Sequence, residues 1–195
     1  MNDQEETERL REDCIDSRLV FDGKVLHLYV DDIRLPDGTI GFREYIRHIG
    51  AVAVLPLTEN GEVVCVRQYR YAVGAVLTEI PAGKLDFAGE NPRDAALREL
   101  REETGARCEK LTYLGRYLGS PAILNEKIEL YLAEGLRFGN TDFDDDEFID
   151  IVRIPLRELT DMVMAGKIPD GKTQLAVLKT QELLRQRNKE GGTNP

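Results

Sequence analysis

The chain has 195 residues, enough for one domain of catalytic size plus an extension, but short for two full domains. Apolar residues make up 42% and charged residues 32%, a composition that is typical of a globular protein and excludes collagen-like and low-complexity chains. Subtracting 36 acidic from 26 basic residues gives a net charge of −10, which argues against a nucleic-acid backbone or an anionic membrane as partner.

The cysteines and the hydropathy pattern point to a cytoplasmic protein. Cys14, Cys65 and Cys108 are far apart, odd in number and lack CxxC spacing, so neither a disulfide framework nor a zinc site is predicted. The longest apolar stretch, residues 49–57, is well short of the roughly 20 residues that a membrane helix needs. We therefore expect a reducing compartment and no membrane association.

Residues 1–48 are predicted to form a small antiparallel β unit. About the first 13 residues are polar and are expected to be disordered, because they offer little apolar surface to offset the entropy of ordering. Strands are predicted at 18–21, 25–35 and 39–49, with a hairpin turn at Pro36-Asp37-Gly38. A unit of this size cannot bury both faces alone, so a partner is expected to cover it.

Residues 49–195 are predicted to form a mixed α/β domain. Its best-defined element is a helix over 92–104, with Asn91 as N-cap, Pro92 in the first turn and Gly105 as the stop. Asp170 is expected to cap a last helix. The other expected elements are strands at 51–57, 62–71, 76–83, 111–118, 127–136 and 148–155 and helices at 156–165 and 172–185.

Three carboxylates gather on the helix predicted over 92–104. Glu99, Glu102 and Glu103 are three or four residues apart, so their side chains leave one face within a single turn. Like charges at this spacing destabilise a helix unless a cation joins them, and Mg²⁺ prefers carboxylate oxygens. Spacing alone leaves two interpretations open, a solvated acidic face and a divalent-metal site.

The residues around these carboxylates resemble the Nudix box, Gx5Ex7REUxEExGU, in which U is apolar. Glu90, Arg98, Glu99, Leu100, Glu102, Glu103, Gly105 and Ala106 all match its spacing. One departure is that six residues, KLDFAG, separate Gly83 from Glu90 where the family has five. The extra residue affects the path of the loop and leaves the helix ligands in place.

The resemblance implies both a fold and a metal site. The expected fold class is α+β, a Nudix α/β/α sandwich with a mixed sheet, preceded by the N-terminal β unit, so that 49–195 is the catalytic domain. Glu99, Glu102, Glu103 and the carbonyl of Ala82 are implied as ligands of Mg²⁺, with Mn²⁺ as a substitute. Glu102 is also expected to assist catalysis, and Arg98 to orient the set by pairing with Glu90.

Between about Ser17 and Thr180 the chain is similar to the ADP-ribose pyrophosphatase branch of this family. The phrases that carry the similarity are VFDGK, LPDG, HIGAVAVLPL, VRQYR, EIPAGKLD and GKIPDGKT. Pro121, fifteen residues after Ala106, stands where ADP-ribose hydrolases have a proline, although a plain turn would also explain it. The implied reaction is cleavage of ADP-ribose to AMP and ribose 5-phosphate, with another nucleoside diphosphate sugar such as GDP-mannose as the alternative substrate.

The same similarity assigns roles to residues outside the box. Arg70 is expected to contact phosphate, Glu79 to face the ribose or the metal-bound waters, and Arg47 to lie near the substrate. Each of the two arginines is otherwise an ordinary surface residue, and Tyr69 and Tyr71 belong either to the adenine site or to the core.

A second acidic run, residues 142–147, lies where this branch carries a mobile catalytic acid. Asp145 takes the general-base position and Glu147 a metal-ligand position. Because the family usually has Glu where this chain has Asp145, Glu147 is an alternative base. A solvated loop or a weak Ca²⁺ site is the plainer interpretation of this run.

Other function classes make different predictions. A non-catalytic nucleotide-sensing module would not need all three box glutamates, and an acidic Ca²⁺-binding protein would bind Ca²⁺ tightly without turnover. The resemblance also implies a homodimer in which the N-terminal β units contribute to the partner's substrate pocket.

Overall fold

The computed structural model describes residues 2–142 and 148–191. The chain divides into two compact units, Met1–His48 with Leu118–Glu126, and Ile49–Tyr117 with Lys127–Pro195. Among the described residues, no helix combines the length and the apolar character needed to cross a membrane.

The first unit begins with a helix that the sequence analysis missed, α1 (Asp3–Leu10). The Asn2 side chain accepts a hydrogen bond from the Glu5 amide at 2.9 Å, and the Glu5 carboxylate accepts one from the Asn2 amide at 3.1 Å. This capping box satisfies amides that a frayed end would leave to water. The expected disorder over the first 13 residues is therefore wrong for this stretch.

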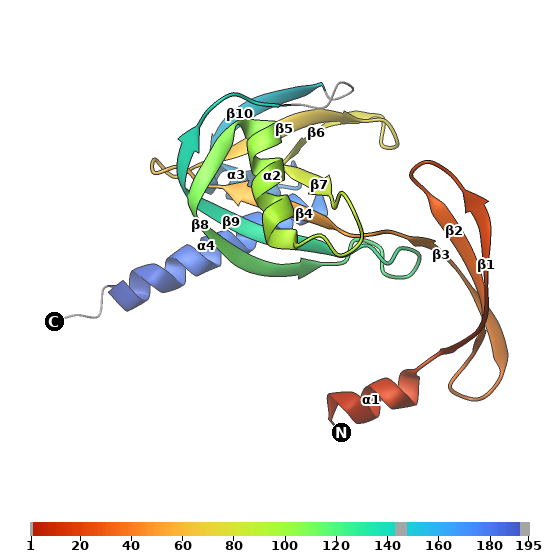
Figure 1. The fold of residues 1–195 in the computed structure, drawn as a ribbon. Helices are drawn as coiled ribbons and strands as arrows, with labels where there is room; N and C mark the ends of the chain where they lie inside the picture. Colours follow the sequence, from red (N-terminus) through yellow and green to blue (C-terminus); the bar gives the residue numbers. More distant parts are fainter. Residues whose placement is uncertain (1, 143–147, 192–195) are drawn as a thin grey trace. The chain divides into compact units, whose positions relative to one another are not determined.

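The rest of the first unit is a three-stranded antiparallel sheet of β1 (Asp13–Asp22), β2 (His27–Arg34) and β3 (Ile40–Arg47), in that order (Figure 1). The predicted turn at Pro36-Asp37-Gly38 joins the last two strands, and Gly38 has a φ of 85° there. Every residue of β1 is exposed, including Leu19 and Phe21. This sheet leaves apolar side chains uncovered in the single chain.

The second unit contains two sheets. The mixed sheet has the order β7-β4-β9-β8, in which only β4 and β9 run parallel, and the antiparallel sheet has the order β10-β5-β6. The strands are β4 (Ala51–Pro56), β5 (Glu62–Arg70), β6 (Ala75–Glu79), β7 (Ala82–Lys84), β8 (Ala106–Tyr117), β9 (Ile128–Phe138) and β10 (Ile149–Pro155). Most of them match predicted strands, but the single strand predicted at 76–83 is wrong, because β6 and β7 are separate strands in different sheets, and β8 begins five residues before the strand predicted at 111–118.

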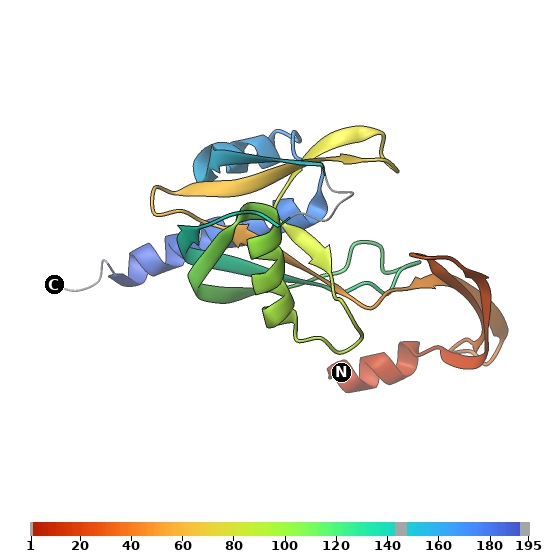
Figure 2. The ribbon, with the colours of Figure 1, turned by 45° about the horizontal axis from the view of Figure 1, so that its top comes forward.

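Helices cover the mixed sheet, whose strand β4 is buried on both faces. On one face, Val52 and Val54 pack against Ala96 and Leu100 of α2 (Pro92–Thr104). On the other, Leu55 and Leu130 pack against β5, α3 (Leu156–Met164) and α4 (Gly171–Gly191), an arrangement visible in Figure 2. Burial on both faces explains the unbroken apolar run of β4. The α+β fold with a mixed sheet and an N-terminal β unit is confirmed.

Candidate active site

Helix α2 presents the box glutamates from a well-capped scaffold. The Asn91 side chain accepts a hydrogen bond from the Arg93 amide at 2.9 Å, and Gly105 ends the helix with a φ of 68°. Packing of Ala96 and Leu100 against the sheet then fixes how the helix is rotated about its axis. As a result Glu99 and Glu103 are buried, an unusual environment for carboxylates and one that requires partners.

Glu99 lies directly against the backbone of Gly83 in β7. A Cβ atom added to Gly83 would come within 2.1 Å of Glu99 Oε1, a distance that atoms cannot adopt. A larger residue at this position would therefore have to displace the Glu99 carboxylate. The contact joins the start of the box to its helix.

Arg98 is the hub of the cluster. Its Nη1 donates to Glu99 Oε1 at 2.7 Å and to Glu102 Oε2 at 3.2 Å. Its Nη2 donates to the Lys84 carbonyl at 3.2 Å and lies 3.5 Å from Glu90 Oε2, so the expected Arg98–Glu90 pair is present. Burial opposes the guanidinium charge, but the charge of Glu99 and the other carboxylates outweighs burial and raises the pKa of Arg98. One permanent positive charge thus holds the acidic face together.

The extra residue between Gly83 and Glu90 is absorbed by a turn. The Glu90 amide donates to the Phe87 carbonyl at 3.1 Å, and Gly89 has a φ of 90°. The Glu90 carboxylate in turn accepts from the Asp86 amide at 2.7 Å. Glu90 therefore lies next to Arg98 despite the departure from the family spacing.

Glu103 is hydrogen-bonded to the residue that precedes the box glycine. Its Oε2 accepts a hydrogen bond from the Ala82 amide at 3.2 Å, and Ala82 pairs with Ala53 in the mixed sheet. Ala82 and Glu103 are thus neighbours, as a shared metal site requires. A cavity of about 400 Å³ is lined by Arg98, Glu99, Glu102, Asp142 and residues 83–86.

The donor set fits a hard divalent cation in its chemistry. Three carboxylates and nearby backbone carbonyls are the oxygen ligands that Mg²⁺ and Mn²⁺ take. Within the described residues, however, no three acidic, His or Cys side chains converge closely enough to hold an ion as they stand. The reason is that the carboxylates of Glu99 and Glu102 are turned toward Arg98, whose guanidinium neutralises them in place of a metal ion.

A second buried cluster surrounds Glu79, at the end of β6. Arg70 donates to both oxygens of Glu79, from Nε at 2.7 Å and from Nη2 at 2.8 Å, and Lys172 donates to Oε2. Glu79 is only 1% exposed, and burial raises its pKa, but the hydrogen bonds and charges of Arg70 and Lys172 outweigh burial and lower the pKa. Glu79 is therefore ionised at neutral pH.

This second cluster bears on the predicted roles of Arg70 and Glu79. The hydrogen bonds with Glu79, and then the charges of Glu79, Glu103 and Asp170, raise the pKa of Arg70, so Arg70 lies within electrostatic reach of the box. Glu79 faces two basic side chains, whereas the sequence analysis expected it to face ribose or water. Arg70 keeps 39% of its side-chain surface exposed, which leaves it accessible to an anion.

Lys172 and Thr173 were missed as members of this cluster. Lys172 also donates to Asp170 at 2.9 Å, and Thr173 accepts from the Ile80 amide at 2.9 Å while its amide donates to Asp170 at 3.0 Å. The phrase GKIPDGKT and the cap at Asp170 were visible in the sequence, but neither indicated that Glu79 lies nearby.

Arg47 belongs to the first unit, on β3. Its guanidinium lies over the Tyr29 ring at 3.7 Å, and its Nε donates to the Tyr45 hydroxyl at 2.9 Å. Tyr45 donates in turn to the buried Asp31 at 3.0 Å. Arg47 is thus held flat against an aromatic face, a position suited to stacking on a planar group.

The remaining candidates are mixed in outcome. Tyr69 and Tyr71 are 57% and 91% exposed, so the interpretation that places them in the core is wrong. Pro121 lies in a turn closed by the Ile123 amide and the Ser120 carbonyl at 3.0 Å. Asp145 and Glu147, the proposed base and additional metal ligand, lie outside the described residues.

Comparisons with known proteins identify the family and the fold. The family model described as the NUDIX domain matches residues 47–174, and the nucleoside diphosphate sugar hydrolase N-terminal domain matches residues 11–46. The solved structure titled crystal structure of ADP compounds hydrolase has a TM-score of 0.79 and covers 91% of this chain and 96% of its own. At 21% identity, it shows the fold alone.

Curated relatives match most of the chain. A methanol dehydrogenase activator of Bacillus methanolicus is 43% identical over 89% of this chain and 96% of its own. An ADP-ribose pyrophosphatase of Bacillus subtilis is 39% identical over 86% and 91%, and a GDP-mannose pyrophosphatase of Yersinia pestis is 33% identical over 76% and 80%. The box geometry and these matches together establish that the chain belongs to the Nudix hydrolase family, in the branch of the ADP-ribose pyrophosphatases.

Proposed function

We propose that this protein is a Mg²⁺-dependent hydrolase that cleaves the diphosphate of ADP-ribose to AMP and ribose 5-phosphate. Family membership already makes it a hydrolase of nucleoside diphosphate sugars. The observation that carries the proposal is the box cluster, in which Glu99 packs against Gly83 while Arg98 binds Glu99 and Glu102. The fold does not need three glutamates at this place, so their clustering favours a role in metal binding.

The proposed ligands of Mg²⁺ are Glu99, Glu102, Glu103, Glu147 and the carbonyl of Ala82, with Mn²⁺ as a substitute. A divalent ion bound there would neutralise diphosphate charge and lower the pKa of water. Arg98 donates hydrogen bonds to both Glu99 and Glu102, and its positive charge offsets the repulsion between their carboxylates.

Other side chains would bind the substrate and activate water. We assign Arg70 to a phosphate, because its guanidinium is fixed by Glu79 and still partly exposed. Arg47 is proposed to contact the substrate, and Glu79 to act through Arg70. Asp145 is the proposed general base, with Glu147 as the alternative.

Alternative substrates and one further function deserve tests. GDP-mannose is the alternative within the same class, supported by the relative named for it. A second candidate function is activation of a dehydrogenase, supported by the relative named methanol dehydrogenase activator. Adding the protein, or its Glu103→Gln variant, to a methanol dehydrogenase assay would show whether activation occurs and whether it needs hydrolysis.

We also propose a cytoplasmic homodimer. All three cysteines are free, as expected in a reducing compartment. The N-terminal sheet exposes Leu19, Phe21, Ile40 and Phe42, and a second copy would cover such apolar side chains. Light scattering at micromolar concentration should report a dimer, and a monomer would refute this assembly.

The decisive experiment measures AMP release from ADP-ribose in the presence of Mg²⁺. Wild-type protein should release AMP, with kcat/KM higher for ADP-ribose than for GDP-mannose. Glu103→Gln should remove nearly all turnover, because it withdraws a charged ligand, while circular dichroism stays unchanged. Glu158→Gln, the same change at an exposed position of α3, is the matched control. Turnover of Glu103→Gln within a few-fold of wild type would overturn the ligand assignment.

A further inference from the structure

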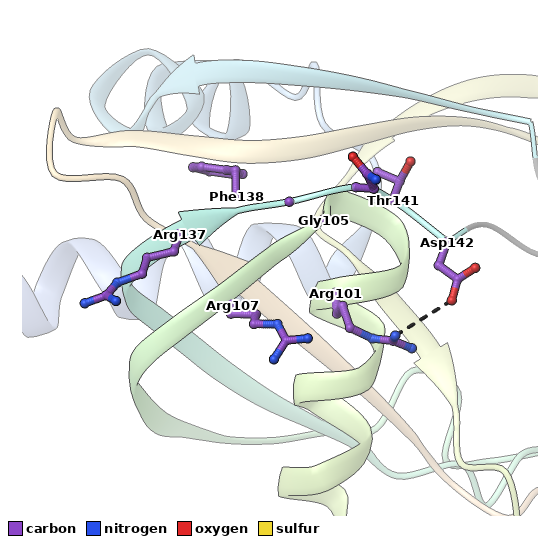
Figure 3. A pocket seen from close by; sticks show the side chains of 9 residues that line it. Arg101, Gly105, Arg107, Arg137, Phe138, Thr141 and Asp142 are labelled. Carbon is purple, nitrogen blue, oxygen red and sulfur yellow. Dashed lines mark ion pairs between the residues drawn. The ribbon is translucent and has the colours of Figure 1, made fainter.

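A second cavity lies at the C-terminal end of α2, distinct from the substrate contacts assigned above. It has a volume of about 430 Å³ and lies where α2, the start of β8 and the end of β9 meet (Figure 3). Three arginines line it, Arg101, Arg107 and Arg137, together with Asn140 and Thr141. This is a concentration of positive charge in a chain whose net charge is −10.

The register between β8 and β9 brings two of these arginines opposite each other, which is electrostatically unfavourable. Arg107 stands directly opposite Arg137 in the antiparallel register, so their side chains leave the same face of the sheet. Like charges directly opposite each other destabilise a strand pair. The two side chains extend in opposite directions, and Arg107 is directed toward the side on which Arg101 lies (Figure 3).

The available carboxylates compensate two of the three arginines. Arg137 donates to Glu109 at 2.6 Å, and Figure 3 shows its side chain directed away from Arg101. Arg101 donates to Glu102 at 2.7 Å and lies 3.7 Å from Asp142. The exposed Arg107 side chain has no ion pair among the described residues.

We propose that this cavity binds a phosphate dianion, either inorganic phosphate or the phosphate of a nucleoside monophosphate. Arginine guanidinium groups bind phosphate oxygens in pairs, and Arg101 and Arg107 both line the cavity, with side chains that Figure 3 shows directed away from Arg137. Thr141 and Asn140 add neutral donors. For a nucleoside monophosphate, Phe138 offers a ring that is 44% exposed, with Arg153 4.5 Å from its centroid.

Arg101 links this cavity to the box, because Glu102 faces the other cavity and Asp142 lines both. The Asp142 amide also donates to the Glu102 carbonyl at 3.0 Å. A phosphate bound to Arg101 competes with the Glu102 carboxylate and frees it for a cation. By linkage, phosphate and Mg²⁺ should strengthen each other's binding. This coupling rests on the proposed role of Glu102, whereas phosphate binding itself does not.

The test is calorimetric titration of inorganic phosphate into the full-length protein in EDTA, so that its outcome is independent of turnover. Arg107→Gln should weaken binding about tenfold or more, as expected for one charge-assisted hydrogen bond. Lys110→Gln is the matched control, because it removes one positive charge from the same strand outside the cavity. Its affinity should stay within about twofold of wild type.

Two further variants sharpen the result. Glu102→Gln should tighten phosphate binding a few-fold, because Arg101 loses its charged competitor. AMP in place of phosphate separates the two sources, since a base on Phe138 makes AMP the tighter ligand and Phe138→Ala then weakens AMP alone. Equal affinities assign the site to inorganic phosphate. No saturable phosphate binding up to about 10 mM, or equal weakening by Arg107→Gln and Lys110→Gln, overturns the proposal.

Discussion

Lys172 offers a sharp test of the cluster around Glu79. Lys172→Met keeps most of the side-chain volume but removes the ammonium group that donates to Glu79 and Asp170. The Lys172 side chain is 11% exposed and the Glu79 side chain 2%, so water cannot readily replace the lost partner. The variant should therefore be less stable than the wild type.

The loss of stability depends on the partner that Glu79 keeps in the variant. Removing the sole partner of a buried charge costs about 3–5 kcal/mol. Arg70 still binds both oxygens of Glu79, so the loss should approach that of one charge-assisted hydrogen bond, about 1.5–3 kcal/mol. At roughly 2–4 °C per kcal/mol for a chain of this size, Tm should fall by about 3–12 °C.

The loss of stability in Lys172→Met should depend on pH. Because the native pKa of Glu79 is lowered, its ionised form stabilises the fold above its unfolded-state pKa, and this stabilisation is lost as pH falls through the native pKa. The difference between wild type and Lys172→Met should thus be largest near neutral pH and shrink below about pH 4.

Urea denaturation followed by circular dichroism, at several pH values, measures this difference. Lys167→Met is the matched control, because Lys167 is exposed shortly before α4. If Lys172→Met at pH 7 costs no more than the control, the ion pair does not stabilise the protein. If the cost is the same at every pH, the reasoning from Glu79 ionisation is refuted.

Three other perturbations have expected outcomes. Gly83→Ala should lower kcat/KM about 100-fold because its Cβ displaces the Glu99 carboxylate, whereas Gly41→Ala, which meets only Leu35 atoms at 3.5 Å or more, should have little effect in the same AMP assay. Asn91→Ala should cost about 1 kcal/mol in urea denaturation through the lost helix cap, and no loss would show that the cap is dispensable. EDTA should abolish turnover without changing the circular dichroism spectrum, and Mg²⁺ should restore it; turnover that persists in EDTA would contradict metal dependence.

The residues that could be predicted from sequence are those whose partners are close in sequence. Spacing along α2 placed Glu99, Glu102 and Glu103 on one face, and Asn91 and Gly105 marked its ends. Helix α1 had a comparable local signal, Asn2 followed three residues later by Glu5, but its uniformly polar composition favoured disorder. Local sequence signals therefore predict helices such as α2, and the capping signal at Asn2 and Glu5 also indicates α1.

The contacts that could not be predicted join distant parts of the chain. The sequence does not indicate that Lys172 reaches Glu79, because 93 residues separate them. The opposition of Arg107 and Arg137 depends on strand register, which a hydrophobic pattern leaves undetermined when both strands carry polar residues at one end. The orientation of Glu102 toward two arginines likewise depends on where Arg101 and Arg98 meet it in space.

The two hydrogen bonds that join residues 79–80 to residues 172–173 also decide when, during synthesis, the cluster around Glu79 can be completed. Glu79 and Ile80 emerge from the ribosome long before Lys172 and Thr173, their partners. Until then a buried carboxylate next to the box lacks one of its two cations. The strands and α2 can form during synthesis, but the environment of Arg70 is completed only when the last helix docks. A nascent chain released before α4 should therefore be folded in part and catalytically immature.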